Sequence, residues 1–328
     1  MQKTDLQELE EKIKIPVISP ENKKLEYEVK IRKNPAFGSR ARIAPKREFR
    51  LKEIKKIRRY GGKKECYFCN PEKCAKFSPE SNLKKQYFLN NSFAFSNLFP
   101  FGKIHGVIVY NYKSHVLDPR VIVLNEWVDG LTLVQSIGKE SKKPYVSTHV
   151  NCGEKAGTSL EHFHGQFLCE NEPLEKVKHA MKNTGEWEGG SKNYWYAWIE
   201  SMKNAGLLID SDESNTVFYV EWSPTFGKVE LVIINLDKPS FLSLSKEEIM
   251  ATAKFLKMGV EIIMKLSDQF NVINLSASPE DDFCNQFRIF PRAPSKEGMK
   301  SWEGYLENLG ETVPSIEPED FVKKFIKS

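Results

Sequence analysis

The sequence predicts an α+β protein made of two copies of one unit, each with an antiparallel sheet and packed helices. Runs rich in β-branched and aromatic residues, which favour strands, occur in both halves of the chain. Each half also contains a helical stretch, and the order strand pair, helix, strand, loop and strand occurs twice. The 328 residues, 40% of them apolar, suffice for more than one domain.

In the first half, a helix is expected near residues 118–137. The strands are expected at Gln86–Asn97, His105–Tyr110, Tyr145–Asn151 and Leu160–Leu168. Residues 1–30 are charged and are expected at the periphery, and they precede a basic segment, residues 32–50, with a short strand-like centre.

In the second half, the helix that begins after Ser245 has the clearest start signal. Ser245 is followed three residues later by Glu248, which is the pattern of a capping box. A short helix that begins with proline is expected in the C-terminal sequence PEDFVKKFI. We interpret the tryptophan-rich segment 171–215 as an insert or linker. Strands are expected at Thr216–Trp222, Val229–Leu236, 271–275 and 286–291.

The repeat can be aligned without gaps by setting residues 150–167 over residues 273–290. Asn151 then meets Asn274, and His162 and His164 meet Asn285 and Phe287. This alignment predicts two domains, residues 1–195 and residues 196–328, with the chemistry kept only in the first. The alternative is a single larger α+β domain.

Composition excludes several classes of protein. The net charge of +5 is mild and scattered, which suits an enzyme for anionic substrates but does not indicate a nucleic-acid partner. No apolar run is long enough for a membrane span, and the polar N-terminus has no signal-peptide core. The six cysteines are spread over a large chain, which is typical of a reduced, cytoplasmic protein.

The run Glu161-His162-Phe163-His164-Gly165-Gln166 is the predicted reactive centre. On a strand, residues 162, 164 and 166 would share one face. We expect His164 to attack phosphorus, because a neutral imidazole is a good nucleophile near pH 7. Gln166 can donate to a phosphate oxygen, and the loop 153–159 offers backbone N–H groups and a hydroxyl. The alternatives are that the histidines are core or edge residues, or that both bind metal.

The sequence Cys66-Tyr67-Phe68-Cys69 is a C-x-x-C turn that can place two thiolates on one metal ion. Such a site needs two further ligands, and the residues alone leave several candidates open. The alternatives are a redox pair or two unrelated loop cysteines. A metal ion here would be structural and would orient the ring of His162. The candidate ligands are His105, His115, His149, His162, Cys74 and Cys152.

Four of these motifs together resemble galactose-1-phosphate uridylyltransferase and its relatives in the histidine-triad (HIT) superfamily. The segment RKNPAFGSRARIAPKREFR is similar to the family's R-x-N-P…P-x-R-x-x-R segment, and CYFC is similar to its metal turn. FLNNSFAF resembles its nucleoside-contacting strand. NCGEKAGTSLEHFHGQ matches the signature N-x-G-x-x-x-G-x-S-x-x-H-P-H-G-Q without a gap. The matches cover residues 30–170 in order.

The resemblance implies a HIT-like fold with two tandem units, a zinc site and a covalent nucleotidyl-histidine at His164. It implies that Gln166 steadies the transferred phosphoryl group. The implied substrate-binding residues are Arg47, Arg50, Asn91, Asn151 and Ser159, and the implied ligands of the structural Zn²⁺ are Cys66, Cys69, His115 and His162.

The implied activity is the transfer of a nucleoside monophosphate from a nucleotide sugar to a sugar phosphate or phosphate, as in galactose metabolism. The alternatives are an enzyme similar to ADP-glucose or diadenosine tetraphosphate phosphorylase, and a zinc-stabilised nucleotide-binding module without catalysis. The resemblance also implies a homodimer.

The chain departs from the family pattern at three places. Phe163 stands where the signature has proline. The second half has NQFRIFPR in place of a histidine-rich strand, so we expect no second metal. Leu306 follows Gly304-Tyr305 where the family has glutamate, which leaves the hexose open.

Overall fold

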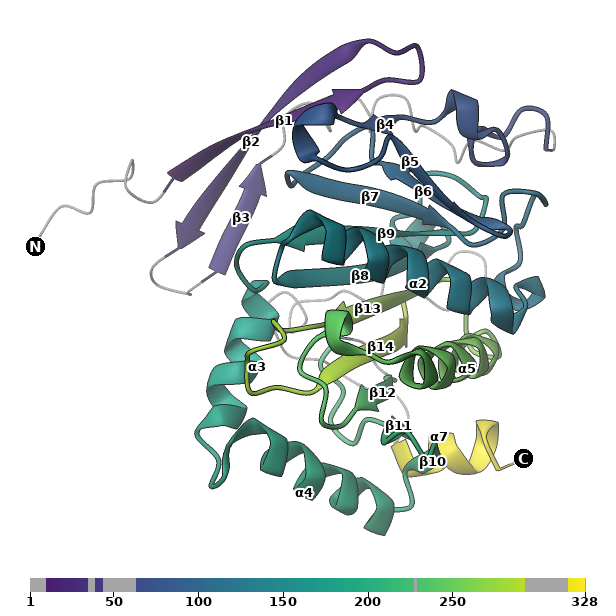
Figure 1. Cartoon of the computed structure of the whole chain (residues 1–328). Helices are drawn as coiled ribbons and strands as arrows, with labels where there is room; N and C mark the ends of the chain where they lie inside the picture. Colours follow the sequence, from purple (N-terminus) through teal and green to yellow (C-terminus); the bar gives the residue numbers. More distant parts are fainter. Residues whose placement is uncertain (1–9, 35–38, 44–62, 227–228, 293–317, 328) are drawn as a thin grey trace, which may run out of the picture.

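The computed structural model of the chain describes residues 10–34, 39–43, 63–226, 229–292 and 318–327 (Figure 1). It contains two antiparallel sheets with helices packed on them, which confirms the predicted α+β class. The larger sheet has ten strands in the order β10-β11-β12-β14-β13-β8-β9-β7-β6-β5, and the smaller has the order β3-β2-β1-β4.

The first half of the large sheet follows the predicted order, with one strand divided. The predicted run 86–97 is a hairpin, because Asn90 adopts a positive φ of 50° and reverses the chain. The helix begins later than expected, after a turn of 3₁₀ helix at Pro119–Val121. The elements are β5 (Gln86–Leu89), β6 (Ser92–Ser96), β7 (Ile104–Val109), α2 (Leu124–Ser141), β8 (Tyr145–Cys152) and β9 (His164–Glu170).

The second half repeats this arrangement. The predicted capping box at the start of α5 is confirmed: Ser245 Oγ accepts from the Glu248 N–H at 3.2 Å, and Glu248 accepts from the Ser245 N–H at 2.7 Å. The C-terminal helix also lies where the sequence predicts it. The elements are β10 (Leu208–Ser211), β11 (Thr216–Val220), β12 (Leu231–Asn235), α5 (Lys246–Ile263), β13 (Phe270–Leu275), β14 (Asn285–Pro291) and α7 (Pro318–Phe325).

Strands β8 and β13 pair in the middle of the sheet and join the two halves. Counted outward from this pair, the strands on one side are β9, β7, β6 and β5, and those on the other side are β14, β12, β11 and β10. The two sides therefore have the same order relative to the chain. Helix α2 links β7 to β8 and helix α5 links β12 to β13, and the two helices pack side by side on one face of the sheet (Figure 1). In the first half, the opposite face of the sheet is therefore not covered by these two helices.

The two halves are related less simply than the gap-free alignment predicts. Gly165 lies against Ile108 on the face that α2 covers, so the neighbouring His164 points to the opposite face. In β14, Ile289 lies against Gly259 of α5, so Phe287 points to the helix-covered face. Phe287 and His164 therefore point to opposite faces of the sheet, so the gap-free alignment does not match the faces of these two strands.

The segment 171–215 was interpreted as an insert, and the structure resolves it into two helices and the edge strand β10. These helices are α3 (Glu175–Gly185) and α4 (Gly190–Asn204), which pack against each other. The expected division after residue 195 falls inside α4, and the division into two domains stays a prediction.

The N-terminal part forms a strand hairpin that the charged sequence did not predict. It consists of β1 (Glu10–Ile18) and β2 (Lys24–Asn34), with β3 (Ser39–Ile43) and β4 (Lys76–Phe77) at its edges. Strand β1 alternates exposed charged residues with buried ones, among them Ile15 and Val17. The hairpin extends away from the large sheet in Figure 1.

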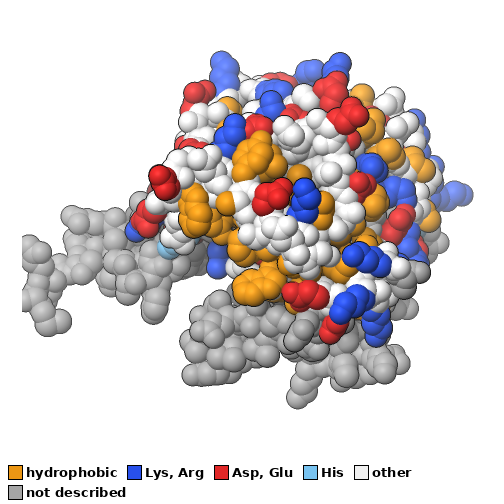
Figure 2. All heavy atoms as spheres, turned by 90° about the horizontal axis from the view of Figure 1, so that it is seen from below, with side chains coloured by type: hydrophobic (Ala, Val, Ile, Leu, Met, Phe, Trp, Pro, Cys, Tyr) orange, Lys and Arg blue, Asp and Glu red, His pale blue; other side chains and the backbone are white. Residues whose placement is uncertain are grey.

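The end of the molecule near α4 and α7 has a mixed surface. Figure 2 shows Lys and Arg side chains interspersed with Asp and Glu on this face, with separate hydrophobic side chains between them. None of the described helices combines the length and the apolar character needed to cross a bilayer.

Candidate active site and metal centre

Strand β9 begins at His164, four residues later than the predicted strand. His164 and Gln166 therefore share the face that the helices leave open, as expected. His162 precedes the strand in a bend, so it is not itself a strand residue, but its ring packs against Phe68, as the ring of His164 does. The bend frees the His162 ring to turn toward the cysteines.

The backbone fixes the tautomer of His164. Its Nδ1 lies 2.7 Å from the carbonyl oxygen of His162. A carbonyl only accepts, so Nδ1 carries the proton, and the lone pair of the neutral ring is at Nε2. The ring also packs edge-on against Phe68, with centroids 4.7 Å apart. The ring of His164 is thus held in place, and the nitrogen that carries the lone pair is defined.

His164 and Gln166 open into a cavity of about 350 Å³. Ser159, predicted to contact phosphate, lines the same cavity. Aromatic side chains form part of its wall, and the tip of the β1–β2 hairpin closes one side. Among the additional lining residues are Glu21, Tyr27, Phe68, Lys73, Phe95, Asn97 and Phe99. The cavity combines an apolar wall with a few polar groups, as small-molecule sites do.

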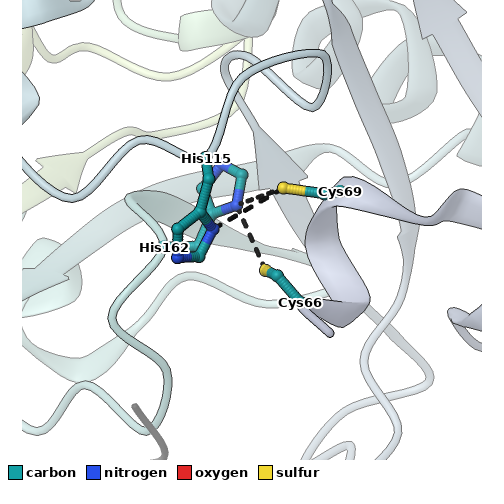
Figure 3. Close-up of side chains that lie close together, drawn as sticks. All are labelled: Cys66, Cys69, His115 and His162. Atoms are coloured by element: carbon teal, nitrogen blue, oxygen red, sulfur yellow. Dashed lines mark hydrogen bonds between the residues drawn. The ribbon is translucent and has the colours of Figure 1, made fainter. Parts of the chain in front are cut away.

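The four predicted metal ligands come together beside this cavity. Their ligand atoms all lie within 4.8 Å of one another, and they come from three separate segments of the chain (Figure 3). The ring atom Nδ1 of His162 is 3.4 Å from both sulfurs, and Nδ1 of His115 is 3.6 Å from Cys69 Sγ. The ligands are Cys66, Cys69, His115 and His162. Two sulfurs and two nitrogens form a donor set that suits a tetrahedral ion such as zinc.

The surroundings of His162 also suit a ligand. Its Nε2–H donates to the Asn111 carbonyl at 3.0 Å, which leaves the Nδ1 lone pair facing the cysteines. Burial lowers the pKa of His162 to about 3, so the ring is neutral near pH 7. Burial raises the pKa of Cys66 and raises that of Cys69 to about 12, so metal binding must displace thiol protons.

Phe163, which replaces the family's proline, anchors the link between the two histidines. Its N–H donates to the Val116 carbonyl at 2.7 Å, which a proline could not do. The side chain is buried against Tyr110 and Trp127, with ring centroids 5.5 and 5.6 Å away. Phe163 therefore holds this loop by a hydrogen bond and ring contacts, the first of which proline could not make.

The glycine loop is held by residues of the second half. Gly153 and Gly157 have φ of 88° and 89°, which favour glycine, and they flank one turn of 3₁₀ helix. Asn271 of β13 donates to Asn151 Oδ1 at 2.7 Å and to the Ala156 carbonyl at 3.1 Å. The second half thus fixes the loop next to His164.

The remaining predicted substrate-binding residues either lie away from the His164 cavity or fall outside the described residues. Asn151 lines a neighbouring cavity of about 450 Å³. Asn91 lies in the β5–β6 turn, where its amide donates to Glu126 at 3.2 Å, and it does not line the His164 cavity. Arg47 and Arg50, like Gly304-Tyr305, lie outside the described residues. The substrate contacts of all these residues stay predictions.

Two residues of the site were not predicted. His105 was one of several open metal candidates, but its ring lies 2.9 Å from Gln166 Oε1, away from the four ligands. Asn97 donates to the same oxygen at 3.0 Å. The signal available was the position of His105 on a predicted strand and of Asn97 at the end of another, but pairing across strands cannot be read from one sequence.

Comparisons with solved structures identify the fold. No protein-family model and no curated protein sequence matches the chain. A uridylyltransferase structure aligns with it at 18% identity and a TM-score of 0.65, over 90% of this chain and 97% of the other. The chain has the fold of the uridylyltransferases.

Two further structures with a uridylyltransferase-like fold come from Arabidopsis thaliana. An ADP-glucose phosphorylase with bound ADP-glucose aligns at 16% identity and a TM-score of 0.57, over 91% of this chain and 98% of its own. A galt-like protein aligns at 17% identity and a TM-score of 0.55, over 79% of this chain and 90% of its own. At these identities the likeness establishes the uridylyltransferase fold, and the activity has to be argued from the site.

Proposed function

We propose that the protein is a nucleotidyltransferase that passes a nucleoside monophosphate through a covalent bond to His164. The observation that carries this proposal is the hydrogen bond from His164 Nδ1 to the His162 carbonyl, which defines Nε2 as the nucleophile. Gln166 and Ser159 line the same cavity and supply groups that can hold phosphate oxygens.

The reaction has two steps of the same kind. In the first, His164 Nε2 attacks the α-phosphorus of a nucleotide sugar. The N–P bond forms as the bond from phosphorus to the bridging oxygen breaks, and the sugar phosphate leaves with that electron pair. In the second, an oxygen of a sugar phosphate or of inorganic phosphate attacks phosphorus, and the electron pair returns to Nε2. The Nδ1–H stays hydrogen-bonded to the His162 carbonyl throughout.

The metal site has a positioning role in this proposal. Cys66, Cys69, His115 and His162 would hold a structural Zn²⁺, which when bound cross-links the site and supplies no open coordination position. Because His162 is both a ligand and the acceptor for His164 Nδ1, its placement sets the orientation of the nucleophile.

We also infer that the sheet consists of two tandem HIT-type units, residues 1–195 and 196–328, with one reactive centre. The repeated strand order and the paired helices α2 and α5 support this inference. Gln286 and Arg288 occupy the face of β14 that matches His164, so no histidine takes its place there. The six free cysteines support a reducing cytoplasm as the location.

The test is intact-mass spectrometry after mixing the protein with a panel of nucleotide sugars that includes UDP-glucose and ADP-glucose. We expect a nucleotidyl adduct whose mass identifies the base, and its discharge by either phosphate or a hexose 1-phosphate identifies the acceptor. His164→Asn should slow turnover by at least about a thousandfold, because it removes the nucleophile.

His179→Asn is the matched control, since His179 is exposed on α3 and belongs neither to the lining of the His164 cavity nor to the Cys/His cluster. It should form the adduct as the unsubstituted protein does. Binding of nucleotide sugars without any adduct would favour the zinc-stabilised binding module instead. Normal turnover in His164→Asn would exclude the covalent mechanism.

A further inference from the structure

The side-chain oxygen of Gln166 accepts hydrogen bonds from Asn97 and His105, two residues that have no role in the function proposed above. Asn97 Nδ2 donates to it at 3.0 Å, and His105 Nε2 lies 2.9 Å from it. His105 is 1% exposed and Gln166 is 6% exposed, so bulk water has little access to these groups. Two donors therefore meet at one buried amide oxygen.

The backbone determines which atoms of Asn97 and His105 donate. The Phe99 N–H donates to Asn97 Oδ1 at 2.9 Å, so the NH₂ group of Asn97 is the end that faces Gln166. The Phe101 N–H donates to His105 Nδ1 at 3.4 Å. Nδ1 of the neutral ring is therefore the acceptor, and the proton is on Nε2, 2.9 Å from Gln166 Oε1. Asn97 Nδ2 also lies 3.3 Å from His105 Nε2, and the shorter distance from Nε2 to the Gln166 oxygen favours donation to that oxygen.

These two donors permit only one orientation of the Gln166 amide. A flipped amide would set its NH₂ against two other donors and leave buried polar groups without partners, which costs about 1–3 kcal/mol for each group. Among the described residues, no acceptor lies within hydrogen-bond distance of Gln166 Nε2. Its N–H groups are thus available in the cavity that Gln166 shares with His164.

We propose that His105 and Asn97 are positioning residues that hold the Gln166 amide with its NH₂ directed at the phosphoryl group transferred to His164. The proposal rests on the function proposed above. In this arrangement, the backbone N–H groups of Phe99 and Phe101 fix the side chains of Asn97 and His105. These two side chains in turn fix the Gln166 amide, which donates to the non-bridging oxygens of the phosphoryl group. Charge develops on these oxygens in the transition state, where a preoriented donor acts most strongly.

The kinetic test compares His105→Phe with His105→Gln. The phenyl ring removes the donor and keeps the volume, whereas the Nε2 of glutamine can replace the imidazole Nε2–H. We expect His105→Phe to slow adduct formation on His164 by at least about tenfold, with KM for the nucleotide sugar changed less than about threefold. His105→Gln should recover most of the rate.

A double-mutant cycle with Gln166→Ala separates positioning from a merely structural role. If His105 acts through Gln166, His105→Phe should produce no further slowing once Gln166 is alanine. An equal slowing in both backgrounds would overturn the proposal, as would an unchanged rate in His105→Phe alone.

A measurement without turnover tests the geometry directly. The ¹⁵N shifts of the His105 ring in the intact protein should report a neutral ring protonated at Nε2. Protonation at Nδ1 would overturn the positioning network whatever the activity. If the unsubstituted protein forms no adduct with any nucleotide sugar, the proposed function fails, and the ring tautomer still decides the network.

Discussion

At the scale of a single residue, His162 makes separate contacts through its ring and through its backbone carbonyl. Its ring belongs to the Cys/His cluster, and its backbone carbonyl accepts from His164. A shift of this residue would move a member of the Cys/His cluster and the acceptor for His164 Nδ1 together. If the cluster binds a metal as proposed, metal binding is coupled to the orientation of His164.

Zinc affinity should fall as the pH is lowered. Burial raises the pKa of Cys66 and of Cys69, to about 12 for the latter, so protons compete with the metal for both sulfurs. Chelator competition at pH 6 and pH 8 should show the metal leaving more readily at pH 6, with about one zinc per chain at saturation. Cys66→Ser should weaken binding, and Cys284→Ser, a buried cysteine outside the cluster, should not. Equal affinity at both pH values would contradict thiolate ligation.

The residues of the site could be predicted only in part from the sequence. The spacing of His164 and Gln166 on a strand identified the shared face correctly. The third ligand, His115, needed the family resemblance, because distances between remote segments are set by tertiary packing. His105 was left as a metal candidate for the same reason, since its neighbour Gln166 is 61 residues away in the chain.

At the scale of elements, close packing between β7 and β9 fixes the strand that carries the site. Gly106 lies opposite Phe167, and a Cβ at Gly106 would lie 2.1 Å from the Phe167 ring. Phe167 is fully buried, so its ring cannot move aside without disturbing the core.

Gly106→Ala should therefore destabilise the protein by about 1–3 kcal/mol, the usual cost of overpacking. The unfolding midpoint in urea measures the change. Gly185→Ala is the matched control, because a Cβ there has nothing within 4 Å, and it should leave stability unchanged or slightly higher. A Gly106→Ala protein as stable as the control would show that β7 and β9 pack less closely than described.

Elements with strong local signals were predicted well. The capping box at Ser245 and the β-branched runs of β7, β8 and β12 are such cases. The β1–β2 hairpin was missed because its charged exposed residues masked the alternation of its buried ones. The mismatch of faces between β9 and β14 in the gap-free alignment has a similar origin: residue types were matched, but the faces of strands were not.

At the scale of the whole molecule, the second half repeats the strand order of the first but has no counterpart of His162 and His164 on β14. Arg288 of β14 is buried on the open face and contacts the carboxylates of Glu221 and Glu230. Burial raises the pKa of Glu221 above its ordinary value, even though Arg288 opposes this shift. A buried ion cluster thus lies on the face of the second half that the helices leave open.

Arg288→Met should destabilise the protein by about 3–5 kcal/mol near pH 7, because it leaves two buried carboxylates without a cation. The loss should shrink as the pH falls: a carboxyl with a pKa raised by folding binds protons more tightly in the folded state, so acid favours folding. Urea unfolding at pH 5.5 and pH 7.5 measures this. Adding Glu221→Gln and Glu230→Gln to the Arg288→Met protein should recover stability, and a failure to do so would argue against the uncompensated charges as the cause.

Phe163 has a consequence for how this sequence can change in evolution. Proline at this position would remove the hydrogen bond to Val116 and would empty the space between Tyr110 and Trp127. A variant with proline there would have to satisfy that carbonyl and fill that space by other means. Exchange between the two solutions therefore requires coordinated substitutions, and position 163 should show strong epistasis with positions 110, 116 and 127.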